Sequence, residues 1–135
     1  MEELYEFAEK NKISIYRKKI PAVKSMAVAG AICLDDDLSR KEERTRLGHE
    51  IGHVVKNAFY TRNDPTFIRR RMENSADRWE IKKLVPKDEL KKAFENGYTE
   101  TWELSDYFDV EEDLIRKAIC LYTQGNLALE YYFNM

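Results

Sequence analysis

Both histidines of this 135-residue chain lie in one short segment, RLGHEIGHVV, at residues 46–55. His49 and His53 are four residues apart, and Glu50 directly follows the first of them. On a helix this spacing places both imidazoles on one face, about one turn apart. Whatever the chain folds into has to present that face of the helix to a neighbouring element or to a site.

Helix signals surround this segment. Ser39 and Glu42 form an S-x-x-E capping box, which predicts a helix that begins near residue 40 and ends near residue 57. Apolar residues recur on one side of this predicted helix, at Leu47, Ile51, Val54, Val55 and Ala58. The segment is therefore predicted to be an amphipathic helix that packs on a core.

Gly48 and Gly52 stand beside the two histidines and are also four residues apart. A glycine inside a helix costs about 1 kcal/mol relative to alanine. A helix that contains both of them is expected to be approached closely by another backbone or by a ligand. Tight helix packing and a ligand site both satisfy that expectation.

The two imidazoles suit a metal ion, since nitrogens so placed can take adjacent corners of a zinc tetrahedron. With Glu50 the segment reads H-E-x-x-H, a pattern typical of metalloproteases, in which the glutamate acts as general base. The alternative is a chance occurrence on a charged helix, with the histidines satisfied in the core.

A catalytic zinc site of this kind needs a third protein ligand. The segment MENSADRWEIKKLVP offers Glu73 for that role. Asp77, one turn further along, can hold the far nitrogen of a ligating histidine and fix its tautomer. Glu80 lies on the same face and is the rival third ligand. Any of these acids could instead be a solvated or ion-paired side chain.

Around this centre the sequence predicts an α+β fold, in which a small N-terminal antiparallel sheet packs on a mainly helical body. We expect one domain over residues 1–135, with the metal-site helices in 39–86, a helical C-terminal part in 87–125 and a tail in 126–135. The predicted elements are a helix at 2–10, a strand at 13–20, a strand or hairpin at 25–34, and helices at 40–57, 68–84, 86–97, 99–108 and 110–125.

Composition narrows the class of protein. Charged residues make up 36% of the chain, but the formal net charge is only −2, which gives no electrostatic case for nucleic acid as a direct partner. The run Arg69-Arg70-Arg71 is interpreted as a solvated helix face. We found no apolar block of a signal peptide or a membrane span, and Cys33 and Cys120 form no paired motif. A reduced, cytoplasmic setting is expected, with both thiols packed in the core.

The two motifs together resemble the ImmA/IrrE family of metallopeptidases. That family shows HExxH followed by E-x-x-A-N/D-x-F-A-x-x-L-L-x-P, and the resemblance covers roughly residues 39–122. The second pattern is matched here by Glu73, Ala76, Asp77, Trp79 (at the aromatic position), Leu84 and Pro86. The chain departs from it with Glu80 in place of alanine and Lys83 in place of leucine, which suggests a more exposed helix on that side.

The resemblance implies a gluzincin-like zinc peptidase of the phage or mobile-element type, with a zincin-like active-site helix. By resemblance His49, His53 and Glu73 would hold Zn²⁺, Glu50 would be the general base and Asp77 would support a ligand from behind. The implied function is an intracellular zinc endopeptidase that cleaves a helix-turn-helix transcriptional repressor. The alternative is a metal-stabilised binding module that sequesters a repressor or another protein and cuts nothing; a degenerate member without metal is a weaker third.

A peptidase also needs a place for its substrate. The segment SMAVAGAIC, residues 25–33, could serve as an edge strand for an extended peptide, with an ordinary core strand as the preferred alternative. Tyr60, Tyr98 and Tyr107 are candidate donors to the oxyanion, and the sequence does not choose among them. The aromatic tail LALEYYFNM could pack on the body or bind a partner.

Overall fold

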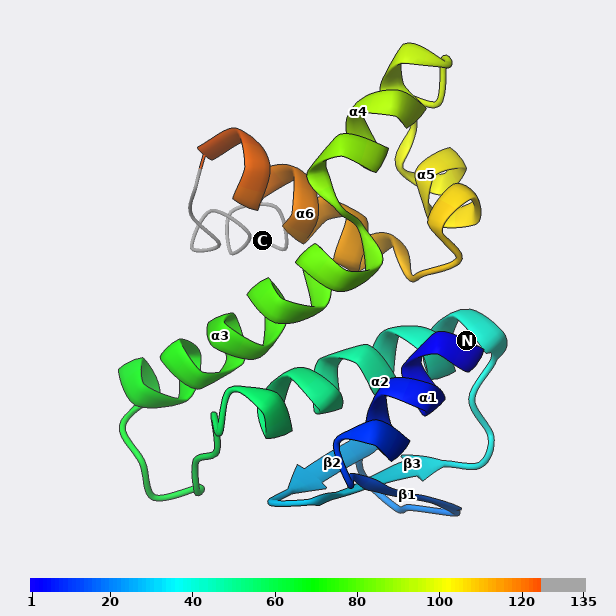
Figure 1. The fold of residues 1–135 in the computed structure, drawn as a ribbon. Helices are drawn as coiled ribbons and strands as arrows, with labels where there is room; N and C mark the ends of the chain where they lie inside the picture. The colour runs from blue at the N-terminus through cyan, green and yellow to red at the C-terminus, as the bar shows by residue number, and fades with distance from the viewer. Residues whose placement is uncertain (125–135) are drawn as a thin grey trace.

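The structure is a computed structural model that describes residues 1–124 of the chain (Figure 1). Six helices and a three-stranded sheet make up this described part. In chain order the elements are α1 (Glu2–Lys10), β1 (Ser14–Lys18), β2 (Ser25–Val28), β3 (Ala31–Asp35), α2 (Arg40–Val55), α3 (Thr66–Leu84), α4 (Lys87–Glu95), α5 (Thr101–Phe108) and α6 (Glu112–Gln124). The predicted α+β class, with a small N-terminal sheet and a helical body, is confirmed.

The sheet has the strand order β1-β3-β2 and is mixed. β2 and β3 pair antiparallel as a hairpin, and Gly30 takes the positive φ of +79° in the tight turn between them. β1 pairs parallel to β3, so the prediction of an antiparallel sheet is wrong for this pair. The chain leaves β1 and crosses to the far edge before it forms the hairpin, and β1 and β3 therefore run in one direction.

Helix α2 is the centre of the molecule and lies between the sheet and α3 (Figure 1). The expected capping box is present: Ser39 Oγ accepts from the Glu42 backbone N–H, and the Glu42 carboxylate accepts from that of Ser39. Leu47 and Ile51 are completely buried in the core, together with Leu34 of β3. Cap and apolar stripe thus fix where α2 begins and which face it turns to the sheet.

Helices α2 and α3 pack closely, and the two glycines of α2 explain how. A Cβ atom at Gly52 would lie 2.6 Å from the backbone oxygen of Ala76 in α3. One at Gly48 would lie 2.8 Å from the Leu84 side chain and 3.0 Å from that of Glu80. The expected close approach of another backbone is confirmed at Gly52, and it brings the histidine face of α2 against α3.

The C-terminal helices stack beyond α3 (Figure 1). Helix α3 ends at Leu84, two residues before Pro86, as expected for a proline that cannot continue a helix. Both cysteines are free; Cys120 is buried as expected, and Cys33 is only half-buried. None of the described helices has the length and apolarity needed to cross a membrane. The aromatic tail lies outside the described residues.

Candidate metal centre

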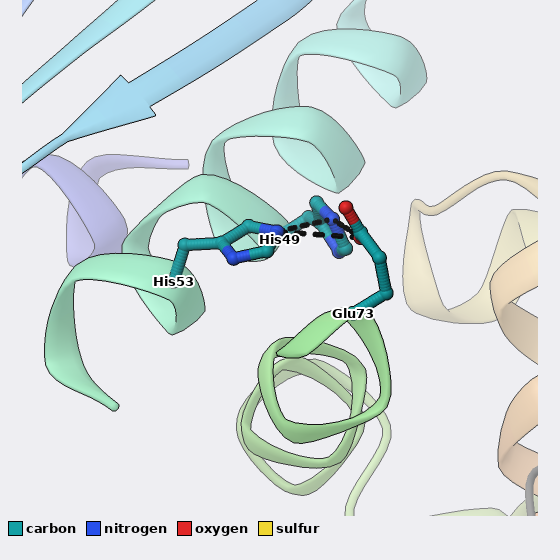
Figure 2. A group of neighbouring side chains, drawn as sticks. All are labelled: His49, His53 and Glu73. Carbon is teal, nitrogen blue, oxygen red and sulfur yellow. Dashed lines mark hydrogen bonds and ion pairs between the residues drawn. The ribbon is translucent and has the colours of Figure 1, made fainter. Parts of the chain in front are cut away.

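His49 and His53 of α2 and Glu73 of α3 point toward one another (Figure 2). The Nε2 atoms of the two histidines are 3.1 Å apart. Glu73 Oε2 lies 2.7 Å from Nε2 of His49 and 3.3 Å from Nε2 of His53. Three candidate ligand atoms from two helices therefore converge on one point.

These spacings suit a zinc ion. Tetrahedral ligands that bind zinc at about 2.0–2.1 Å lie roughly 3.3 Å from one another. Two of the three separations are 3.1 and 3.3 Å, and the 2.7 Å between His49 and Glu73 needs the carboxylate to move outward by a fraction of an ångström. Two neutral imidazoles and one carboxylate are also a donor set that zinc prefers.

The far nitrogen of each imidazole is held by its own partner. His53 Nδ1 lies 2.6 Å from the carbonyl oxygen of Ala58, just past the end of α2, and donates to it. His49 Nδ1 lies 2.9 Å from Oδ1 of Asp77 in α3. Because these acceptors hold a proton on each Nδ1, the Nε2 atoms are the nitrogens that face Glu73 and that a metal would bind.

The electrostatics of the centre favour positive charge. Burial by itself lowers the pKa of His49, but the contacts with Asp77 and Glu73 and the nearby charge of Glu80 outweigh it and raise that pKa well above its usual value. Burial likewise opposes ionisation of Glu73, yet its contacts with His49 and His53 hold its pKa well below the usual range. A site that attracts protons so strongly also attracts a divalent cation.

The centre opens into a cleft of about 560 Å³. Its walls come from β2 and the residues before it, from α2, from Glu73 and from the segment after α2 that holds Tyr60. Glu50 is only 7% exposed and lies in this cleft, where its Oε2 accepts a 2.6 Å hydrogen bond from Ser25 Oγ. A carboxylate thus faces the space beside the two histidines.

Of the three tyrosines considered, Tyr60 lines the cleft. Its hydroxyl donates to Glu73 Oε1 at 2.5 Å, and burial together with this hydrogen bond raises the pKa of Tyr60 to about 12. Tyr98 and Tyr107 contact each other, with ring centroids 5.3 Å apart, and do not line the cleft. Tyr60 is the candidate that the structure leaves.

Glu80 occupies a different position from the one expected of a rival ligand. It lies on the Nδ1 side of His49, with Oε1 3.8 Å from that nitrogen, and it does not join His53. Glu80 is 1% exposed, so the expectation that this side of α3 is more exposed is wrong at Glu80 and right at Lys83. A buried carboxyl behind His49 fills the space that Gly48 leaves open.

The sequence reasoning missed three partners of the centre. They are Ser25, which holds Glu50; Ala58, which holds His53; and Lys117 of α6, whose Nζ lies 3.3 Å from Asp77 Oδ2. Ser25 and Lys117 are distant in sequence and belong to no local pattern, so only the tertiary fold brings them to the site. A carbonyl five residues after His53 gives no side-chain signal either.

Two helices that present a pair of histidines and a carboxylate beside an open cleft are typical of metallopeptidases. The chain belongs to the Peptidase_M78 family: the family model described as the IrrE N-terminal-like domain matches residues 6–119. The resemblance to the ImmA/IrrE family is thereby confirmed, and the family supports a metallopeptidase-type function with a protein substrate. No curated protein and no solved structure matches the chain.

Proposed function

We propose that this protein is a zinc-dependent endopeptidase of the HExxH type. In this proposal His49, His53 and Glu73 hold Zn²⁺, Glu50 is the general base, and Asp77 orients His49. The observation that carries it is the convergence of three ligand atoms, 2.7 to 3.3 Å apart, at the wall of a cleft that also contains Glu50.

When bound, the metal would act as a Lewis acid and lower the pKa of a water molecule toward neutrality. Glu50 would accept the proton of the attacking water and pass it to the leaving amine. Ser25 keeps the Glu50 carboxylate turned into the cleft through its 2.6 Å hydrogen bond. Tyr60, whose raised pKa keeps the hydroxyl protonated, could donate to the developing oxyanion after leaving Glu73.

The substrate would bind as an extended strand along β2. This strand is at the edge of the sheet, and residues of β2 line the cleft beside the two histidines. An edge strand offers backbone N–H and C=O groups that a peptide can pair with, which would align one of its bonds with Glu50. The sequence analysis prefers an ordinary core strand for residues 25–33. That expectation is wrong for β2, which lies at the edge of the sheet.

We further propose that the substrate is a helix-turn-helix repressor of a prophage or mobile element, cleaved in the cytoplasm. The support is the resemblance to the ImmA/IrrE family, whose IrrE N-terminal-like domain matches this chain. The two free thiols are compatible with a reducing compartment. The alternative is a metal-stabilised module that binds the repressor without cutting it.

Glu50→Gln separates these two functions. The purified protein, zinc and a candidate repressor are incubated, and the products are analysed by mass spectrometry alongside the zinc content of each variant. For a peptidase, the wild type should produce two defined fragments, while Glu50→Gln retains zinc and loses at least about a thousandfold in rate. If Glu50→Gln relieves repression in cells as well as the wild type does, the binding module is the function instead.

A further inference from the structure

The outer side of α3 carries a cluster of cations that the metal centre does not use. Two shallow hollows, of about 340 and 470 Å³, lie along it and share Ser75 and Arg78. Neither hollow has an acidic residue in its walls. We call this surface the α3 basic face; its cations are Lys56, Arg70, Arg71, Arg78, Lys82 and Lys83.

The helix period explains why these residues share one side. Phe67, Arg71, Asn74, Arg78 and Lys82 follow one another at steps of three or four residues, which forms a single stripe along α3. The inward stripe of the same helix carries the acids of the metal centre. Helix α3 therefore carries acids on the side that meets the histidines of α2 and cations on the side that lines the two hollows.

Four of the six cations of this face have no ion pair with another described residue. Within the described residues, Lys56, Arg71, Arg78 and Lys82 have no acidic side chain at ion-pair distance, although the chain has 25 acidic residues. The chain carries a formal −2, so without the six cations of the face the remaining residues carry −8. The face thus groups six cations with no acid in the walls of its hollows, while the other residues of the chain together carry a net negative charge.

We propose that the α3 basic face binds an acidic segment of a partner protein, one that combines carboxylates with a large apolar side chain. Phe67 is 63% exposed at one end of the face, and Trp79 lines the hollow at the other, so apolar contacts are available beside the guanidinium groups. The stretch from Phe67 to Lys83 is roughly 24 Å long, enough for about seven extended residues.

Charge distribution favours a peptide over nucleic acid as the occupant. Duplex DNA is a long, densely charged rod, and its field would also meet the acidic remainder of the molecule. A short acidic segment meets the basic face alone. The hollows beside Phe67 and Trp79 also suit side chains of a peptide. The inference stands apart from the peptidase chemistry, because no residue of the face lines the cleft of the metal centre.

The test is fluorescence anisotropy with a labelled peptide of about eight residues that alternates glutamate and leucine, at low and moderate salt. Its twin carries glutamine in place of every glutamate. We expect the acidic peptide to bind and to weaken with salt, and the glutamine twin to bind at least about tenfold more weakly. Absence of measurable binding of the acidic peptide at low salt would overturn the proposal.

Two triple variants with the same change in net charge locate the site. Arg71→Gln/Arg78→Gln/Lys82→Gln removes three cations of the face and should weaken peptide binding about tenfold. Lys12→Gln/Lys18→Gln/Lys91→Gln removes three exposed lysines elsewhere and should leave it within about twofold. Equal losses in both variants would reduce the effect to nonspecific attraction. Tighter binding of a duplex DNA of random sequence would assign the face to nucleic acid and refute an acidic peptide.

Discussion

Each ring nitrogen of His49 contacts a carboxylate of α3. Asp77 lies at Nδ1, and Glu73 lies at Nε2, where a metal would bind. This pairing raises the pKa of His49 well above its usual value, so the metal-free protein holds a proton there at neutral pH. Any metal that binds at Nε2 has to displace a proton from the centre.

The apparent zinc affinity should therefore increase with pH. Because the folded-state pKa of His49 is raised, proton competition is strongest at low pH and disappears as pH rises through that pKa. We expect affinity to strengthen by up to about tenfold per pH unit between pH 6 and 8 for each proton displaced. Competition with a chromophoric chelator at fixed ionic strength measures it. A flat profile would contradict proton displacement.

Asp77→Asn tests how the Asp77 carboxylate supports His49, through the orientation of the imidazole ring and through its negative charge. The amide keeps a similar shape but removes the charge that supports the His49 proton. Loss of such a supporting carboxylate typically weakens metal affinity about 10–100-fold. We also expect a shallower pH dependence, because the pKa of His49 would fall. Zinc affinity equal to that of the wild type would show that Asp77 has no positioning role.

Glu80 makes a separate prediction about stability. Burial raises the pKa of Glu80 to about 8; the positive charge of His49 opposes this shift and the negative charge of Asp77 adds to it. Ionising an acid whose pKa is raised in the folded state destabilises the fold. This loss of folding stability is absent below the unfolded pKa of 4.5 and grows as pH rises from there to about 8. Glu80→Gln, which carries no charge, should gain about 3 kcal/mol relative to wild type at pH 7 in the metal-free protein.

Denaturant unfolding of the metal-free wild type and Glu80→Gln between pH 5 and 9 checks this. The difference between the two curves should be small at pH 5 and should widen with pH. Glu73→Gln is the matched comparison: the pKa of Glu73 is lowered, so its carboxylate stabilises the metal-free fold above pH 4.5, and its loss should destabilise the protein at pH 7. A parallel shift of the Glu80→Gln curve at every pH would contradict a charge effect.

At the scale of single residues, the sequence predicted the converging side chains because H-E-x-x-H has a fixed spacing on a helix. For the third ligand the sequence analysis names Glu73 and keeps Glu80 as the rival. The geometry separates them, since Glu73 faces both Nε2 atoms and Glu80 lies behind His49. The burial of Glu80 could not be read from the sequence, because a charged residue at that position predicts exposure.

At the scale of elements, the helix α2 and its pairing with α3 determine the site. Glu73 reaches the histidines only because Gly52 lets the α3 backbone approach α2 at Ala76. An alanine Cβ at residue 52 would lie 2.6 Å from a backbone oxygen, which cannot rotate away. At residue 48 the same atom would meet the flexible ends of Leu84 and Glu80.

Gly52→Ala and Gly48→Ala should therefore differ. We expect Gly52→Ala to lower the free energy of unfolding by about 2 kcal/mol or more, and to weaken zinc binding because α3 moves away with Glu73. Gly48→Ala should cost less, since alanine gains about 1 kcal/mol of helix propensity and the side chains can shift. Chemical denaturation and zinc titration of both variants measure these effects. Equal losses would mean that backbone approach at Ala76 is not what matters.

Element boundaries followed from local signals where such signals exist. The capping box at Ser39 and the proline at 86 predicted the start of α2 and the end of α3. The parallel pairing of β1 with β3 had no such signal, because strand order depends on where the connection crosses and not on either strand's own pattern. The sequence therefore predicted the helices of the site better than the sheet beside them.

At the scale of the whole molecule, the net charge of −2 hides a strong asymmetry. The sequence interpreted Arg69-Arg70-Arg71 as a solvated helix face, and the composition gave no reason to look further. The helix period places Arg71, Arg78 and Lys82 on one side of α3, but only the three-dimensional arrangement adds Lys56 from the end of α2. Cleft and basic face lie on different sides of α3, so binding at one does not block the other.

The folded structure also determines which backbone groups of β2 stay unpaired at the edge of the sheet. The backbone carbonyl oxygen of Lys24 accepts a hydrogen bond from the backbone N–H of Asp35. Along an antiparallel pair of strands, hydrogen-bonded residue pairs alternate with pairs that are not hydrogen-bonded. Met26 therefore bonds to β3 through its backbone, while the N–H and C=O of Ala27 point away from β3 at the free edge. Those two groups are the ones a bound peptide strand would use.

Ala27→Pro tests strand addition with little damage to the fold, because it removes an outward N–H and leaves the ladder intact. We expect kcat/KM to fall about tenfold or more, with zinc content and thermal midpoint close to wild type. Met26→Pro is the control for structural damage: it removes a backbone hydrogen bond between β2 and β3 and should lower the thermal midpoint. Wild-type cleavage by a zinc-loaded Ala27→Pro would mean that the substrate does not extend β2, because a peptide paired there must lose its bond to residue 27.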